Sequence, residues 1–391
     1  MQSQGERARY WLWVAVLAVA ALLTILAFRR FRRAAEPVGP VPETFTAKSS
    51  NSIPAALTNA ARPGPSDELY QKLLATGASL KAAQNTPVLQ RQLAELRQTL
   101  SAAGRQQASD VIRRFLEAGT DAPTGSGFEL GGGGSLVNSP SLRVFLLDLL
   151  AEIDPQAAVA YSRRILENPG SPDEWAIALR NVARLDSAPG TREFLEQKTE
   201  AMLRQDPWVN GPSTGFLEAF DVAVHLGGTR LLPPLTDLVQ RKDNPAVAHA
   251  AFLALDRMVI RQPAELMEVL EQHPEMMAGR EQTRANYFAR ADVGDPVQRE
   301  ILERYLLDPK RQAPELQSFA GVFPNANFMI SHNLLTSNVT PGGATLARRD
   351  RDALRVVGEW LADPRFVSLR APLLTIQQRL QEFSRQAKSN R

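Results

Sequence analysis

The most regular pattern of hydrophobic and polar positions lies in residues 229–260. Its first half carries an apolar stripe at helical spacing, formed by Leu231, Leu232, Leu235, Leu238 and Val239. After a polar break, Asn244 stands where a helix N-cap belongs, and Pro245 occupies the first helical position. The second half repeats the spacing with Val247, Ala251, Ala254, Leu255, Met258 and Val259. This pattern predicts an antiparallel pair of helices that cannot bury its own stripe and therefore needs neighbours.

Helical spacing continues on both sides of this pair. Three further helices are predicted by Leu69, Leu73, Leu74 and Leu80, then by Leu89, Leu93, Leu96 and Leu100 after Thr86-Pro87, and then by Val111, Ile112, Phe115 and Leu116 before Gly119. Residues 344–361 and 366–387 predict a terminal pair that would cap the array.

A capping residue followed by proline precedes several apolar runs, at Ser139-Pro140, Asp154-Pro155, Ser171-Pro172, Asn244-Pro245 and Asp295-Pro296. The polar side chain can accept bonds from the first amides of a helix, and proline has no amide that needs a partner. Ser171 with Glu174 also fits a capping box. Intervals of 15 and 17 residues separate Ser139, Asp154 and Ser171, which predicts helix pairs at the period of a helical repeat.

Residues 229–260 resemble a HEAT repeat. The resemblance rests on a leucine-rich first helix with proline near its start, a short turn containing Asp243, and a second helix rich in valine and alanine. Arginine, which is common early in the second helix of that family, is missing, and Val247-Ala248-His249 stands there instead. The resemblance implies an all-α fold, an α-solenoid of stacked antiparallel helix pairs that binds other proteins, and it implies no particular activity.

A possible membrane anchor lies at residues 10–28, a stretch of nineteen residues without charge. This length can cross about 30 Å of hydrocarbon as a helix. A cleaved signal peptide is the alternative, but arginines follow directly without a small-residue cleavage site. Six prolines in residues 29–65 predict a semi-extended tether. The predicted organisation is an N-terminal flank (1–9), a transmembrane helix (10–28), a basic flank and linker (29–65) and a helical repeat domain (66–391).

The arginines that flank this span predict its orientation and account for the basic charge. Four arginines in residues 29–33 outnumber Arg7 and Arg9, so the C-terminal domain should be cytoplasmic, with the periplasm as the alternative. Residues 1–33 hold six arginines and one glutamate, a net charge of +5. This exceeds the net charge of +3 of the whole chain. The folded part is therefore slightly acidic, which argues against nucleic acid as a partner. The dense cluster at 348–355 alternates arginine with aspartate and predicts a solvated helix face.

Recognisable catalytic and cofactor motifs are missing. The chain has no cysteine, which excludes disulfides and thiolate chemistry. Its four histidines lack metal-ligand spacing, and no nucleophile elbow surrounds a serine. The glycines of residues 131–134 lack the Lys-Ser or Lys-Thr of a P-loop and predict a flexible loop. We therefore expect no cofactor, no metal, no small-molecule substrate and no catalytic activity.

Two long interruptions, residues 119–138 and 323–343, break the helical rhythm and predict either functional loops or disordered insertions. The second contains candidate partner contacts at Asn325, Asn327, Phe328, His332 and Asn333. Structural turns are the alternative for its asparagines. The predicted function is that of a membrane-anchored scaffold or adaptor that binds other proteins. An enzyme with its site in one of these loops is the alternative, and it would require a closed pocket with converging titratable groups.

Overall fold

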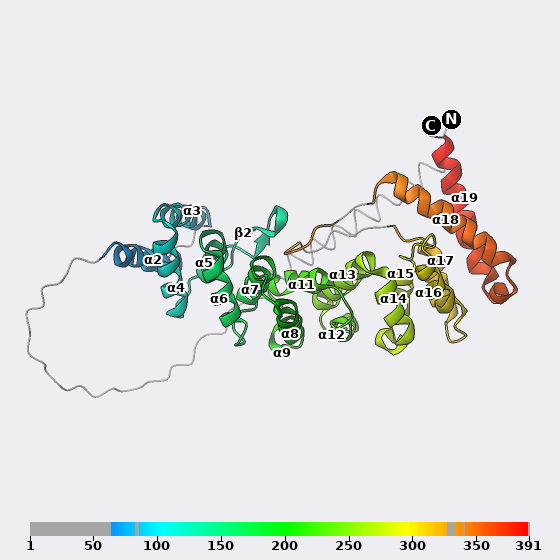
Figure 1. Cartoon of the computed structure of the whole chain (residues 1–391), viewed down its shortest axis with the longest axis horizontal. Coiled ribbons are helices and arrows are strands. Elements are labelled where there is room, and N and C mark those ends of the chain that lie inside the picture. The colour runs from blue at the N-terminus through cyan, green and yellow to red at the C-terminus, as the bar shows by residue number, and fades with distance from the viewer. Residues whose placement is uncertain (1–63, 83–85, 327–332, 339–340, 390–391) are drawn as a thin grey trace, which may run out of the picture. The chain divides into compact units, whose positions relative to one another are not determined.

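The structure is a computed structural model that describes residues 64–82, 86–326, 333–338 and 341–389. The chain divides into units of residues 1–61 and 62–391, and every described residue belongs to the second. That unit is all-α, as predicted, apart from two short strands (Figure 1). The predicted transmembrane helix lies outside the described residues. Within the described part, we find no helix with the length and apolar character needed to span a bilayer.

Helices follow one another along the whole described unit. Its first part contains α2 (Pro65–Ala82), α3 (Thr86–Ala102), α4 (Arg105–Glu117), β1 (Glu129–Leu130), β2 (Leu136–Asn138), α5 (Leu142–Ile153), α6 (Pro155–Ile165), α7 (Pro172–Leu185) and α8 (Thr191–Leu203). Its middle part contains α9 (Asp206–Asn210), α10 (Thr214–Glu218), α11 (Phe220–Leu226), α12 (Leu232–Val239), α13 (Pro245–Arg261), α14 (Pro263–Gln272) and α15 (Glu281–Phe288). Its last part contains α16 (Pro296–Leu307), α17 (Ala313–Val322), α18 (Gly343–Ala362) and α19 (Arg370–Ser389), and 3-10 turns occur at Gly132–Gly134, Pro274–Met277 and Pro364–Leu369.

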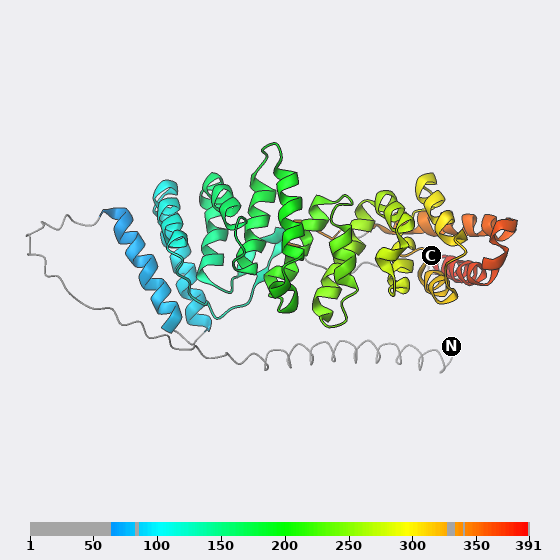
Figure 2. The ribbon, with the colours of Figure 1, turned by 90° about the horizontal axis from the view of Figure 1, so that it is seen from below.

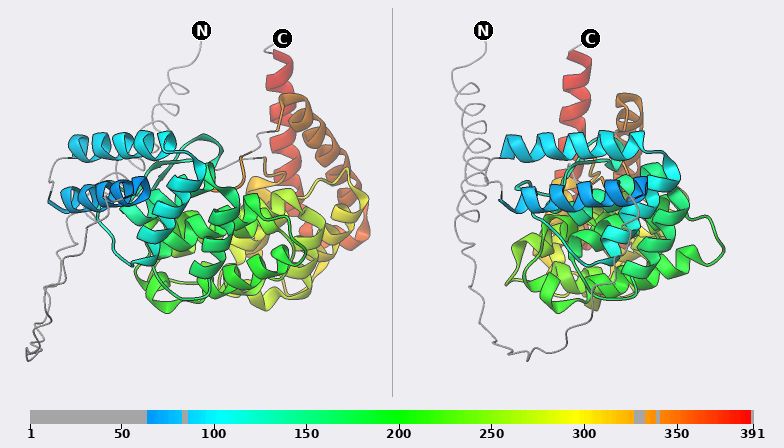
Figure 3. Two further views of the ribbon diagram at one scale, coloured as in Figure 1. Left: turned by 60° about the vertical axis from the view of Figure 1, so that its left-hand side comes forward. Right: turned by 90° about the vertical axis from the view of Figure 1, so that its left-hand side faces the viewer.

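Most of these helices lie in two rows. One row, which we call the loop-facing row, contains α5, α7, α11, α13, α15 and α17, and the other contains α6, α8, α12, α14 and α16 (Figure 1). Helices pack on their neighbours in chain order, as α5 does on α6 and α7, and α13 does on α11, α12 and α14 (Figure 2). Helices α2 and α3 lie side by side before the first pair (Figure 3). The arrangement is consistent with a helical repeat.

The apolar stripes predicted from the sequence form the core. All five stripe positions of α12 are buried, and so are the six predicted positions of α13. The stripes of α3 and α4 are buried as well, and α18 packs on α19 as the predicted terminal pair. In the helices for which the sequence showed a stripe, periodicity therefore predicted the face that is buried, although Leu74 in the stripe of α2 is only half-buried.

Four of the five predicted caps are confirmed. The side chains of Asp154, Ser171, Asn244 and Asp295 accept main-chain amides at the starts of α6, α7, α13 and α16. The prediction at Ser139 is wrong, because Ser141 caps α5. Residues 139–141 instead bond to residues 123–124, which delays the helix. The predicted capping box is also only half formed, since the Glu174 side chain binds Arg143.

Candidate functional site

A series of buried aspartate–arginine pairs joins helices of the loop-facing row. In each pair the arginine lies 32 to 36 residues after the aspartate, on or just beyond another helix of the row. The pairs and their N···O distances are Asp148–Arg180 at 2.5 Å, Asp221–Arg257 at 3.0 Å and Asp256–Arg290 at 2.8 Å. We call this series the aspartate–arginine ladder. An unpaired buried charge is strongly destabilising, so the ladder constrains how these helices dock.

Helix α13 contributes adjacent residues to two pairs of the ladder. Arg257 reaches back to α11, whereas both carboxylate oxygens of Asp256 accept bonds from Arg290, at 3.0 and 2.8 Å. Burial raises the pKa of Asp256, and the charge of Arg290 opposes this shift. Sequence reasoning missed the ladder. Its signal is a charged residue inside an apolar helical run, with the opposite charge one repeat later.

The glycine-rich interruption forms a β-hairpin where its composition predicted a flexible loop. Strands β1 and β2 pair antiparallel on either side of the turn Gly132–Gly134. The main-chain oxygen of Gly133 accepts a bond from Arg184 at 2.5 Å, and that of Gly134 accepts one from Arg180 at 3.1 Å. Both arginines belong to α7, so the turn is fastened to the loop-facing row beside the ladder.

Residues 333–338 of the second interruption, which we call the strap, meet this glycine turn. Arg184 joins the two, because it also donates to the main-chain oxygen of Leu334 at 2.7 Å. Leu334 is fully buried. Gly134 has a φ of +70°, and a Cβ there would overlap the Leu334 oxygen and the Arg184 guanidinium. Glycine is therefore required at this position, and the two interruptions share one surface.

Asp221 on α11 holds the strap by its main chain. One carboxylate oxygen accepts the amides of Leu335 and Thr336 at 2.7 and 2.8 Å. The other accepts the Thr336 hydroxyl at 2.5 Å and Arg257 at 3.0 Å. Asp221 and Thr336 are both buried, so water competes little for these bonds. Arg184, Asp221 and Arg257, which we call the strap site, thus bind the main chain of a bent loop segment together with one hydroxyl.

Two of the five predicted partner contacts fall within the described residues. Asn325 is buried. Its main-chain N–H donates to the main-chain oxygen of Ala289 at 2.7 Å, and its main-chain oxygen accepts a bond from Arg290 at 3.3 Å. It therefore ties the chain after α17 to the ladder. Asn333 begins the strap, and its buried side-chain oxygen has no hydrogen-bond partner among the described residues. Outside those residues lie the other three, Asn327, Phe328 and His332. The predicted contact with a partner stays a prediction.

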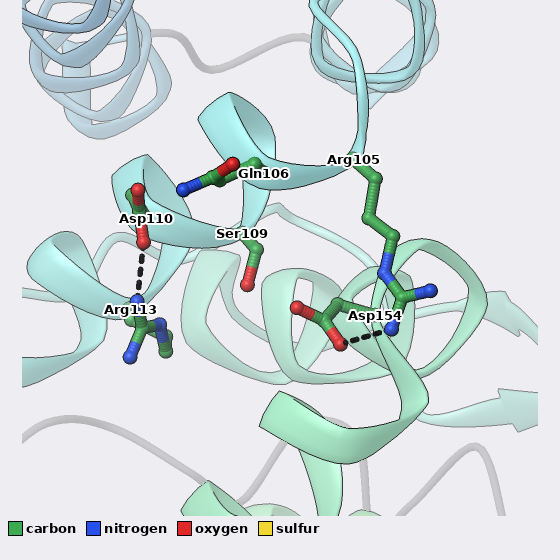
Figure 4. Close-up of a pocket in the computed structure, with 6 residues that line it drawn as sticks. All are labelled: Arg105, Gln106, Ser109, Asp110, Arg113 and Asp154. Atoms are coloured by element: carbon green, nitrogen blue, oxygen red, sulfur yellow. Dashed lines mark hydrogen bonds and ion pairs between the residues drawn. The ribbon is translucent and has the colours of Figure 1, made fainter.

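A polar cavity of about 370 Å³ lies between α4 and the start of α6 (Figure 4). Each of its two arginines has an acidic partner, Asp154 for Arg105 at 3.0 Å and Asp110 for Arg113. Asp154 also caps α6. Burial raises the pKa of Asp154, but hydrogen bonds from Ser109 and Arg105 outweigh this effect and lower it overall. The charges in this cavity are therefore balanced, and the Arg105–Asp154 pair links α4 to the start of α6.

The arginine-rich face predicted at 348–355 is largely engaged in ion pairs. Arg348 bonds to Asp292 at 2.6 Å, and Arg355 bonds to Glu359 at 2.6 Å. Arg349 differs, because it donates to the main-chain oxygen of Arg290 at 2.5 Å and burial lowers its pKa. These bonds fit the predicted solvated face for Arg348 and Arg355, and they make Arg349 a link between α18 and the ladder.

The residues that the structure describes contain no cluster of three histidine or acidic side chains able to hold a metal ion. The chain matches no protein family, no curated protein and no solved structure.

Proposed function

We propose that this protein is a membrane-anchored helical-repeat scaffold that binds other proteins through the loop-facing row. The observation that carries the proposal is the strap site, where one carboxylate oxygen of Asp221 accepts two successive main-chain amides of a loop segment. Main-chain bonds of this kind give affinity without depending on side-chain identity. A surface that holds one segment by its main chain in this way has the chemistry to hold another.

We further propose that residues 66–391 form an α-solenoid with a HEAT-like unit at 229–260. In support, α12 and α13 pack together, and the ladder links helices of one row at separations of 32 to 36 residues. Stacked repeats expose long continuous surfaces, which suit protein partners. Charged partners for the ladder arginines come from within the row, so the ladder positions the surface, and at Asp221 and Arg257 it also contributes groups that bind the strap.

The membrane anchor remains a proposal that rests on the sequence. The uncharged span at 10–28 and the arginine excess after it support a single-pass protein with a cytoplasmic domain. A reporter that is active only outside the cytoplasm, fused at the C-terminus, tests this orientation. Reporter activity would place the domain in the periplasm instead.

Site-specific photo-crosslinking tests the binding proposal. A photoreactive amino acid is introduced into the full-length chain at Val137, which is 60% exposed on the hairpin beside the strap. The matched control is Val297, which is 56% exposed on α16 in the other row. Irradiation of intact membranes should give a discrete adduct at Val137 but not at Val297, and the captured protein, once purified, should bind the chain directly. Adducts at neither position, or equally at both, would contradict the proposal.

The enzymatic alternative would place its chemistry beside the second interruption. A cavity of about 270 Å³ lies there, lined in part by Ala326, Pro341, Arg290, Asp292 and Arg349. Its charged groups already have partners, since Arg290 binds Asp256, Asp292 binds Arg348 and Arg349 binds a main-chain oxygen. These bonds favour a structural role for the cavity.

A further inference from the structure

A second surface carries positive charge that no lining acid balances. A cavity of about 450 Å³, which we call the cationic cavity, lies between the turn that joins α12 to α13 and the start of α15. Its charged lining residues include Arg241, Lys242 and Arg280. Its apolar lining includes Val239, which is buried, and Phe252, which is half-buried, whereas Lys242 is exposed. The apolar groups therefore lie deeper than the Lys242 ammonium.

The cations of this cavity differ in how far they are neutralised. Arg241 is paired with Asp243, with its Nε 2.6 Å from a carboxylate oxygen. Among the described residues, neither Lys242 nor Arg280 has a carboxylate partner, and Arg280 makes only a long 3.5 Å bond to the main-chain oxygen of Arg241. The polar cavity of Figure 4 is the opposite case, because acids from its own lining neutralise both of its arginines. Two cations at the cationic cavity thus remain available to a ligand.

The apolar wall of the cavity is stacked. The rings of Phe252 and Tyr287 lie 5.8 Å apart at 21°, and His249 stacks on Phe252 at 6.2 Å and 24°. Tyr287 is fully buried, and its hydroxyl donates to the main-chain oxygen of Phe252 at 3.1 Å. The Phe252 ring is therefore held in place and can contact an apolar side chain that enters the cavity.

We propose that the cationic cavity binds a segment of a partner protein that presents a carboxylate beside an aromatic or aliphatic side chain. The apolar side chain packs on Phe252, and the carboxylate meets Lys242 and Arg280. Charge complementarity selects an acidic ligand, since charge-assisted bonds to a carboxylate are among the stronger polar contacts. The volume suits one side chain and its carboxylate. The proposal rests on the proposed function only in taking the ligand to come from a protein.

The test uses N-acetylphenylalanine, which joins a ring to a carboxylate, and its neutral amide. Ligand-observed NMR with the full-length chain, and with empty micelles as the blank, should give the acid a Kd on the order of 1 mM. The amide should bind at least about tenfold more weakly. Lys242→Gln/Arg280→Gln should reduce binding of the acid to the level of the amide. The matched control, Arg105→Gln/Arg113→Gln in the polar cavity, should leave it unchanged.

Three results would overturn the proposal: equal binding of acid and amide, unchanged binding by the Lys242→Gln/Arg280→Gln variant, or phenyl phosphate binding more than about tenfold more tightly than the acid. The last would assign the cavity to phosphate ligands. If Lys242→Gln/Arg280→Gln fails to fold, the salt dependence of binding supplies the same test. Raising the salt concentration to about 0.5 M should weaken binding of the acid and leave binding of the amide unchanged. Crosslinking at Val137 can fail while N-acetylphenylalanine binds, and crosslinking can succeed while the probe does not bind. The two experiments therefore test the binding surface and the cationic cavity separately.

Discussion

Replacing Asp221 with asparagine tests the strap site by exchanging one acceptor oxygen for an amide donor of the same size. In one orientation the new amide faces the main-chain N–H groups of Leu335 and Thr336. In the other it faces the guanidinium of Arg257. Both orientations place a donor against a donor inside a buried site, so the substitution cannot relax by turning the side chain.

The size of the effect follows from these bonds. A buried donor left without an acceptor costs about 1–3 kcal/mol, and removing one partner of a buried ion pair costs about 3–5 kcal/mol. We therefore expect the free energy of local opening at the strap to fall by about 3 kcal/mol. Since each 1.4 kcal/mol is a factor of ten, amide exchange should become roughly 150-fold faster.

Hydrogen exchange measured by mass spectrometry provides the local readout, because a repeat array can open in parts. Peptides covering residues 333–338 should lose protection, while those covering α12 should keep it. Asp243→Asn is the control, since its carboxylate is exposed and pairs with Arg241 at the surface, where water screens the pair. Unchanged exchange at the strap in Asp221→Asn would refute the reasoning. So would an equal increase in every helix, which would indicate global destabilisation.

Three further predictions concern the glycine turn, the ladder and the cap of α6. Gly134→Ala should lower the thermal unfolding midpoint and expose the strap to exchange, at a cost of about 2–4 kcal/mol, whereas Gly132→Ala, with nothing within 4 Å, should change stability by less than about 1 kcal/mol. Asp256→Leu should cost about 3–5 kcal/mol in urea unfolding, and adding Arg290→Met should recover part of that loss, which an additive result would contradict. Asp154→Asn should cost about 0.5 kcal/mol at pH 7. The pKa of Asp154 is lowered in the folded state, so the difference in unfolding free energy between wild type and variant should persist above pH 3.8 and vanish as the pH falls through the folded pKa. A constant difference down to about pH 2 in urea unfolding would show that the charge contributes nothing.

Local signals in the sequence were sufficient for those helices whose caps or apolar stripes were recognised. The cap at Asn244 and the stripe of α12 depend on residues within a few positions of one another, so the pattern contains what is needed to predict them. The error at Ser139 arose because its carbonyl accepts a bond from Thr124, which lies 15 residues earlier in the chain. Composition misled at the glycine turn, because bonds from α7 add to the turn's own hydrogen bonds and hold it in one conformation.

The strap site was beyond the reach of local pattern. Asp221 bonds to residues 114 and 115 positions later, and Arg184 bonds to Leu334 across 150 positions. The spacing of hydrophobic residues contains no information on contacts between residues so far apart in the sequence. Asn325 and Asn333 were predicted as partner contacts from residue type alone, whereas the described side chains that bind the strap are ordinary charged residues within helices. Only the fold shows that these helices lie under one loop.

The strap changes how the helical array should respond to force and to ligands. In a stack of helix pairs, stability is approximately a sum of terms between neighbours, and one part can open without its distant partners. The strap adds bonds from residues 333–338 to α7, α11 and α13, so opening between these helices must also break the bonds at Asp221 and Arg184. A partner segment that replaced the strap would keep those bonds but detach them from the C-terminal part of the chain. Binding at the strap site would therefore alter the coupling between the middle of the array and its C-terminal helix pair.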